Sequence, residues 1–252
     1  MKIKTDGLII KEQNIGEQDR LLTILTRDIG IIRVFAKNVR NIKSPKSSST
    51  RLLCYSSFVI YKGRDTYSLN EVELKEMFIP LRKDIVKMSL AQYFCELALY
   101  FVDENMQSEM YLRLILNGLF VIGKGKKPLS LVKSAIELRI LCIAGYMPNL
   151  IFCNECNCYE NEKMCFLPTR GCLVCLSCIK NNKNYENERY IVLCMGATTA
   201  MRHCIYAEFE KLFSFELPEK SLKLLEVASE SYMVNICEKV LKTLDFYKII
   251  SA

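Results

Sequence analysis

The sequence has a single histidine in 252 residues, and it lacks the short motifs from which common enzyme sites are built. Gly123-x-Gly125 has neither a third glycine nor a strand before it, so it does not match a phosphate-binding loop. A zinc deaminase would need His-x-Glu ahead of its cysteine pair, and that pattern is absent. A serine triad would depend on His203 alone, which lies in an expected helix and is better explained by packing or surface exposure. We therefore expect a protein that is not an enzyme.

Long uncharged apolar runs are also missing. The most apolar stretch, residues 85–102, carries Lys87, Gln92 and Glu96, and burying these side chains in lipid would be costly. The apolar patch at residues 8–10 is too short for a secretory leader. We therefore expect no membrane partner and a cytoplasmic location, where thiols stay reduced. In that compartment the 13 cysteines favour metal ligation over disulfides.

Positive charge is concentrated near the N-terminus. The net charge is +7, and residues 1–80 hold 14 Lys and Arg against 9 Asp and Glu. Residues 33–51 contain no acid, and nucleic acid suits such a segment because neutralised phosphates release their counterions. A solvated loop that favours solubility is the alternative. The basic residues of the segment are Arg33, Lys37, Arg40, Lys43, Lys46 and Arg51.

Short runs of apolar and β-branched residues predict strands in the first third of the chain. Asp28-Ile29-Gly30, between the second and third runs, suits a hairpin. Five short strands favour a small closed barrel, for which an OB-fold is the commonest five-stranded solution. Residues 41–50 are too polar for a strand and predict a loop. The expected strands are residues 8–10, 21–25, 31–36, 55–61 and 67–72.

Beyond residue 80 the apolar period becomes helical. Asp84 is a suitable N-cap for a helix that reaches Asn105, and Ser108 opens a second helix. Ser130 is the expected cap of a third helix, which Gly145 terminates. Two further helical segments cover residues 196–213 and 219–244.

Seven of the 13 cysteines lie between residues 153 and 178, and two pairs among them have the spacing of metal ligands. Eighteen residues separate Cys153-x-x-Cys156 from Cys175-x-x-Cys178, as in a four-cysteine zinc ribbon. A two-residue gap lets a tight turn aim both thiolates at one point, and two such turns complete a tetrahedron. We therefore predict that these four cysteines bind one structural zinc ion (Zn²⁺).

The other cysteines of this region leave alternatives open. Cys158 lies close enough in sequence to compete for the metal, and Cys172-x-x-Cys175 has the same spacing as the preferred pairs. Cysteines that are merely buried small hydrophobes, with no metal, are a further alternative. A metalloenzyme is the least favoured interpretation, because four thiolates close the coordination shell whereas catalytic zinc keeps an open position.

Several motifs near the N-terminus form a recognisable combination. They are Gly-Glu-x-Asp at residues 16–19, Thr-x-x-x-Gly at residues 26–30, and Ala36-Lys37, which leads into the basic loop. Together they resemble the bacterial recombination and repair family RecO. That family has glycine where this sequence has Asn38, a position that suits a permissive backbone.

The cysteine region extends the resemblance to nearly the whole chain. Its order of proline, cysteine pair, phenylalanine, Gly-Gly step and second cysteine pair is similar to that of the RecO family. Cys172 takes the place of the second glycine of that step, which identifies it as a replaced glycine rather than a ligand.

The resemblance implies a mediator of DNA repair and homologous recombination. RecO proteins anneal complementary single strands and, with RecR, help load RecA onto DNA coated by single-strand binding protein (the RecF pathway). The implied partners are single-stranded DNA, double-stranded DNA, RecR and the acidic tail of single-strand binding protein, which the family docks on its helical domain. A location at the nucleoid is also implied.

The sequence thus predicts an α+β protein in which a DNA-binding OB-fold barrel precedes an α-helical domain with a four-cysteine zinc-ribbon insertion. The expected limits are residues 1–80 for the barrel, 81–252 for the helical domain and about 148–190 for the insertion. Residues 150–190 carry five Lys and Arg against five Asp and Glu, so we do not expect the ribbon to hold phosphates.

The basic cations of residues 33–51 would contact phosphates, and aromatic side chains would stack on bases. Phe35, Tyr55 and Tyr61 are the candidates for stacking, and Phe35 is the best suited of the three to burial. The alternative function is a zinc-ribbon protein that binds nucleic acid in transcription or acts on RNA.

Overall fold

The computed structural model describes residues 1–41, 43–64 and 66–251. One residue of the predicted loop and the last residue of the predicted helical domain therefore lie outside the described residues. Contacts divide the chain into two compact units, residues 1–124 with 243–252 and residues 125–242. The predicted domain boundary at residue 80, where strands give way to helices, stays a prediction.

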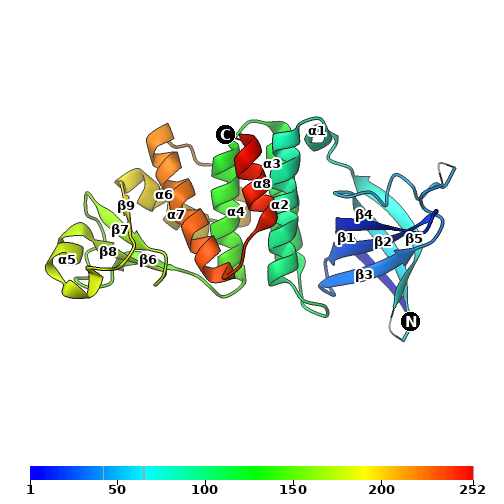
Figure 1. Ribbon diagram of the computed structural model, residues 1–252, viewed down its shortest axis with the longest axis horizontal. Helices are drawn as coiled ribbons and strands as arrows, with labels where there is room; N and C mark the ends of the chain where they lie inside the picture. Colours follow the sequence, from blue (N-terminus) through cyan, green and yellow to red (C-terminus); the bar gives the residue numbers. More distant parts are fainter. Residues whose placement is uncertain (42, 65, 252) are drawn as a thin grey trace. The chain divides into compact units, whose positions relative to one another are not determined.

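A closed five-stranded barrel begins the first unit, blue to cyan in Figure 1. Its strands follow the order β1-β2-β3-β5-β4, and all neighbours are antiparallel except β3 and β5. This is the predicted OB-fold. Every predicted strand is present, and most are longer than their apolar runs. The strands are β1 (Lys2–Ile15), β2 (Asp19–Thr26), β3 (Ile31–Ala36), β4 (Tyr55–Lys62) and β5 (Tyr67–Glu76).

The side chains of β3 alternate between the barrel core and the outer face. Ile32, Val34 and Ala36 are buried in the barrel core, whereas Arg33 and Phe35 lie on the outer face. Phe35 is only half-buried there, so it is not the core residue that its apolar character suggested. The outer face of β3 therefore presents a cation and an aromatic ring.

Four helices complete the first unit. Asp84 caps α2 as predicted, because its Oδ1 accepts hydrogen bonds from the backbone N–H groups of the first turn, Val86 at 3.0 Å among them. The helix ends earlier than expected, at Phe101 instead of Asn105. The helices are α1 (Ile79–Arg82), α2 (Ile85–Phe101), α3 (Glu109–Lys124) and α8 (Lys242–Ser251).

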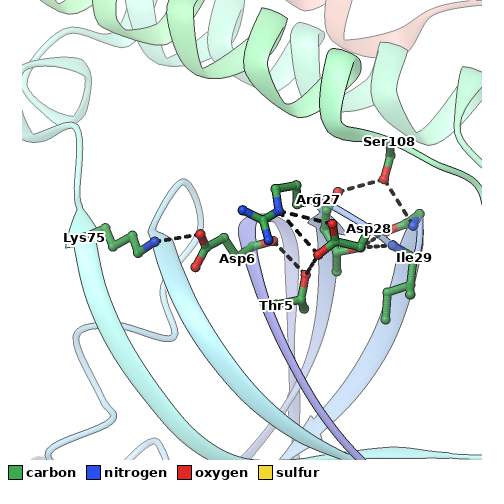
Figure 2. A network of polar contacts seen from close by, with 9 residues as sticks. Thr5, Asp6, Arg27, Asp28, Ile29, Lys75 and Ser108 are labelled. Atoms are coloured by element: carbon green, nitrogen blue, oxygen red, sulfur yellow. Dashed lines mark hydrogen bonds and ion pairs between the residues drawn. The ribbon is translucent and has the colours of Figure 1, made fainter.

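The early end of α2 is explained by the hairpin between β2 and β3. The chain after α2 leaves the helix so that the carbonyl of Asp103 can accept a hydrogen bond from Ile31 N–H. The Ser108 hydroxyl then accepts from Gly30 N–H at 3.1 Å and donates to the carbonyl of Thr26 at 2.7 Å (Figure 2). The barrel and the start of α3 are joined by these contacts.

The longer helices of the second unit are α4 (Leu129–Ile143), α6 (Met195–Tyr206) and α7 (Glu219–Cys237). The prediction that Ser130 caps α4 is wrong: Pro128 is the N-cap, and Ser130 lies within the helix. The segment predicted to run on to residue 244 is two helices, because Glu238 takes a left-handed conformation and ends α7. His203 lies on α6, where its ring packs on Phe215 and bonds to the Lys211 carbonyl.

A small sheet of the order β6-β8-β7-β9 carries the cysteine region of the second unit. A short helix, α5, follows β8 directly, although no helix was expected between residues 148 and 190. Two single 3₁₀ turns cover residues 183–185 and 209–211. The remaining elements are β6 (Asn149–Cys153), β7 (Met164–Leu167), β8 (Cys172–Cys175), β9 (Ile191–Leu193) and α5 (Leu176–Asn181). Within the part of the chain that the structure describes, no helix is long and apolar enough to cross a membrane.

Candidate nucleic-acid interface and metal centre

Four cysteine sulfurs converge at one end of the small sheet. The Sγ atoms of Cys153, Cys156, Cys175 and Cys178 all lie within 4.8 Å of one another. These are the four residues predicted from the paired spacing. Cys153 and Cys175 are buried, and the other two are more accessible.

Each pair is positioned by a strand and the turn that follows it. Cys153 ends β6, and a tight turn, closed by a hydrogen bond of 3.0 Å from Asn157 N–H to the Cys153 carbonyl, brings Cys156 back toward it. Cys175 ends β8 and is the N-cap of α5, whose first turn contains Cys178. The backbone N–H of Cys175 also donates to the Cys153 sulfur at 3.2 Å, which ties the two turns together.

The spacing of the sulfurs suits a tetrahedral metal ion. Zinc–sulfur bonds of about 2.3 Å place the sulfurs of a regular tetrahedron about 3.8 Å apart. Cys156 and Cys175 have a sulfur–sulfur distance of 3.8 Å. The cluster can therefore hold a metal ion, and its soft thiolate donors select zinc or another thiophilic metal.

The pKa values of two thiols in the cluster, those of Cys175 and Cys178, are shifted in opposite directions. Burial raises the pKa of the Cys175 thiol, but hydrogen bonds from Ser177 and from the backbone and thiol of Cys178 outweigh it and bring the pKa to about 6. Burial and the neighbouring sulfurs raise the pKa of Cys178 instead. These hydrogen bonds favour the thiolate form of Cys175, which is the form that binds a metal ion.

Cys172 and Cys158, the two rival ligands, lie outside the four-sulfur cluster. Cys172 is buried in β8, directly after Gly171. A side chain at Gly171 would meet the Tyr232 hydroxyl at 2.8 Å, so only the first position of the Gly-Gly step needs glycine. Cys158 stays next to the cluster, where its carbonyl accepts from Cys153 N–H at 2.9 Å.

A groove with a volume of about 910 Å³ runs across the outer face of the barrel. It is lined by residues of β1, β2 and β3, by the turn between β4 and β5, and by the chain after α2. We call this the barrel groove. Its acids, Asp103 and Glu104, come from the segment after α2. The cations of the barrel groove are Lys11, Arg33, Lys62 and Arg64.

Tyr67 is the aromatic residue of the barrel groove. Lys62 Nζ lies 5.3 Å from the centre of its ring, and its hydroxyl donates to Glu104 at 2.9 Å. Neither Phe35 nor the predicted tyrosines, Tyr55 and Tyr61, line the groove. The three stacking candidates therefore lie outside the barrel groove, and their contact with bases stays a prediction.

The six predicted cations do not all line one pocket. Arg33 lines the barrel groove, whereas Arg51 lines a second pocket together with Arg82. Arg40 is used within the barrel, because its Nη1 donates to the carbonyl of Gly16 at 2.8 Å. Lys46 turns toward the carbonyl of Asn70. The remaining two, Lys37 and Lys43, are exposed.

Three groove cations were missed by the sequence analysis. Lys11, Lys62 and Arg64 are scattered along the chain, and only closure of the barrel brings them to Arg33. The available signal was weak: Lys11 follows a fully apolar run, where a charged side chain must face outward.

Comparison with known proteins covers both units. Residues 1–78 match the family model for the N-terminal part of recombination protein O, and residues 82–245 match the model for its C-terminal part. The chain belongs to the RecO family of DNA repair proteins. It is 34% identical to DNA repair protein RecO of Acetivibrio thermocellus over 98% of this chain and 96% of that protein. Its identity to RecO of Caldicellulosiruptor bescii is 30%, over 98% of both chains.

The motifs of this RecO family member have structural explanations. The Thr26 hydroxyl donates to the Gly30 carbonyl at 2.7 Å and closes the hairpin. Asp19 accepts a hydrogen bond from the backbone N–H of Asn38 at 2.7 Å. Asn38 has a φ of 54°. Position 38, expected to suit a permissive backbone, therefore has a left-handed backbone, which asparagine tolerates.

Proposed function

We propose that this protein binds single-stranded DNA in the barrel groove, anneals complementary strands and, with RecR, helps load RecA onto DNA coated by single-strand binding protein. The barrel groove, an open channel with four cations on an OB-fold, is the observation that carries the proposal. Membership of a DNA repair family supports it. In this account the protein acts without catalysis, in the cytoplasm and at the nucleoid.

The two walls of the barrel groove carry opposite charges, so we expect them to contact different parts of a strand. Lys11 and Arg33 project from the barrel strands, where they can hold successive phosphates without reading sequence. Asp103 and Glu104 repel phosphates from the opposite wall. We expect the DNA backbone to follow the strands, and the bases to point toward Tyr67.

The four-cysteine cluster is proposed to hold one zinc ion with a structural role. Cys153, Cys156, Cys175 and Cys178 would complete the coordination shell and leave no open position for a substrate. When bound, the metal would fix the turns that follow β6 and β8. Cys158 would remain beside the shell as a free thiol.

Strand binding by the barrel groove can be tested with paired variants. We expect Lys11→Ala with Arg33→Ala to weaken binding of a labelled single strand by about tenfold or more at low salt, because each lost phosphate contact is charge-assisted. The slope of log affinity against log salt should fall by about 0.7 for each contact removed.

Lys4→Ala is the matched control for this experiment. Lys4 is an exposed cation on the same strand, and it does not line the barrel groove. Its replacement should leave affinity and salt slope close to those of the unmodified protein. Equal losses in the control and the groove variant would remove the groove from the proposal.

The mediator step is tested with purified partners. Annealing of complementary strands coated by single-strand binding protein should be fast with this protein and slow in the groove variant. RecA filament formation on the coated strand should require this protein and RecR together. If RecA loads equally well without this protein, the mediator part of the proposal is wrong even where DNA binding holds.

A further inference from the structure

A second basic pocket lies in the first unit, and none of the described residues that line it also lines the barrel groove. Its volume is about 410 Å³. It combines two guanidinium groups with three hydroxyl groups, and none of the described residues that line it is acidic. We call it the serine–arginine pocket. Its lining residues are Ser44, Ser47, Ser48, Arg51, Met77 and Arg82.

The guanidinium group of Arg82 is held in position by backbone carbonyls. Its Nε donates to the carbonyl of Met77 at 3.4 Å, and its Nη2 donates to the carbonyl of Leu52. Nη1 makes no hydrogen bond to any residue that the structure describes. Neutral carbonyls orient this guanidinium without compensating its charge, so one edge remains available to an oxyanion.

The loop on the other side of the pocket offers unused donors. Ser47 N–H donates to the carbonyl of Ser44 at 3.0 Å, and the carbonyl of Ser48 accepts from the Cys54 thiol at 3.3 Å, so the loop backbone is fixed. Among the described residues, the hydroxyls of Ser47 and Ser48 and the guanidinium of Arg51 have no hydrogen-bond partner. These groups suit the oxygens of a phosphate.

A buried cation behind the loop adds to the positive field. Arg20 is 3% exposed, and its Nη1 donates to the carbonyl of Ser47 at 3.3 Å. Its Nε has no partner in the described chain. Burial lowers the pKa of Arg20 most, Glu12 raises it, and the nearby Arg51 lowers it further. The cations Arg51 and Arg40 and the carboxylate of Glu12 all interact with Arg20, so the positive charges outnumber the carboxylate, an imbalance that a bound anion would relieve.

We propose that the serine–arginine pocket binds a backbone phosphate of a second DNA strand, while the first strand occupies the barrel groove. This inference rests on the proposed annealing function. Annealing needs two polyanions on one protein, and separate sites with no shared residue hold both strands while limiting their mutual repulsion. Guanidinium edges with hydroxyl donors recognise phosphate oxygens and no particular base.

The test uses Arg51→Ala with Ser48→Ala, and it keeps Arg82 because that side chain also holds the Leu52 carbonyl. A labelled strand is bound first, and a second, non-complementary strand with another label is then titrated in. We expect first-strand affinity within about twofold of the unmodified protein, second-strand affinity at least about tenfold lower, and annealing slowed to match. Ser48→Asp, which adds a carboxylate to the pocket, should give a larger second-strand loss.

Lys83→Ala is the matched control, since Lys83 is an exposed cation next to Arg82 that does not line the pocket. Unchanged second-strand binding and annealing in the Arg51 and Ser48 variants would overturn the inference. The same is true if inorganic phosphate binds the pocket without competing with a second strand. Failure of the unmodified protein to bind even a first strand would instead reject the proposed function, which keeps the two failures distinct.

Discussion

Single residues decide how the barrel of this chain is closed, and Gly30 is the clearest case. Its φ is 73°, and a Cβ at this position would lie 1.8 Å from the carbonyl oxygen of Asp103. The glycine allows the β2–β3 hairpin to press against the segment after α2, which forms one wall of the barrel groove.

Gly30→Ala should therefore destabilise the first unit strongly. We expect a loss on the order of 3 kcal/mol in the free energy of unfolding, from the positive φ and the contact with the Asp103 carbonyl together. Gly16→Ala is the matched control, because Gly16 has a φ of 55° but open space around a Cβ. It should cost about 1 kcal/mol. Similar urea midpoints for the two variants would contradict the role of close approach at Gly30.

Residues whose role is local were predictable from the sequence, and residues whose role depends on a distant segment were not. Asp84 caps the helix that follows it, and the cysteine pairs form turns within four residues. By contrast, Ser130 resembles a cap, but Pro128 is the N-cap and Ser130 lies within the helix. The composition of the barrel groove depends on closure of the barrel, for which single-chain patterns give no register.

At the scale of elements, α4 contains a buried ion pair that its apolar period concealed. Lys133 and Glu137 are both fully buried, with an N–O distance of 3.0 Å. Lys133 also contacts Glu230 of α7 at 2.8 Å, and Ser229 donates to Glu137 at 2.7 Å. The α4–α7 contact is thus fixed in register by polar groups inside an otherwise apolar interface.

Removing one partner of this ion pair should lower the free energy of unfolding more than replacing both partners by uncharged side chains. Lys133→Ala leaves the Glu137 carboxylate buried without its cation, and we expect a loss of about 3–5 kcal/mol. Lys133→Met combined with Glu137→Gln, which can still accept from Ser229, should cost much less. Lys211→Ala, in an exposed pair, should change stability by less than about 1 kcal/mol. Equal losses in the single and double variants, measured by urea unfolding, would contradict the coupling.

The small cysteine-bearing sheet should depend on its metal. We expect one zinc per chain by elemental analysis, loss of zinc in Cys156→Ser, and retention in Cys172→Gly, since Cys172 lies outside the cluster. Chelation should unfold the ribbon, because metal binding and folding are coupled at such sites. Loss of zinc in Cys172→Gly would show that the ligand set is wrong.

At the scale of the whole molecule, the two units have separable roles. The barrel groove and the serine–arginine pocket belong to the unit of residues 1–124, and the cysteine cluster belongs to residues 125–242. The proposed phosphate-binding sites therefore belong to one unit, and the candidate metal site belongs to the other. The spacing of the cysteines predicted the candidate metal site, whereas the surface proposed to bind DNA depends on closure of the barrel.

The central claim is that a single strand occupies the barrel groove, and site-specific crosslinking tests it most directly. A photoreactive benzoylphenylalanine is placed at Gln13, which lines the groove, or at Lys180 of α5 in the second unit. We predict efficient crosslinking to single-stranded DNA from position 13, lost as salt rises, and little from position 180. Crosslinking from position 180 with none from position 13 would contradict the account.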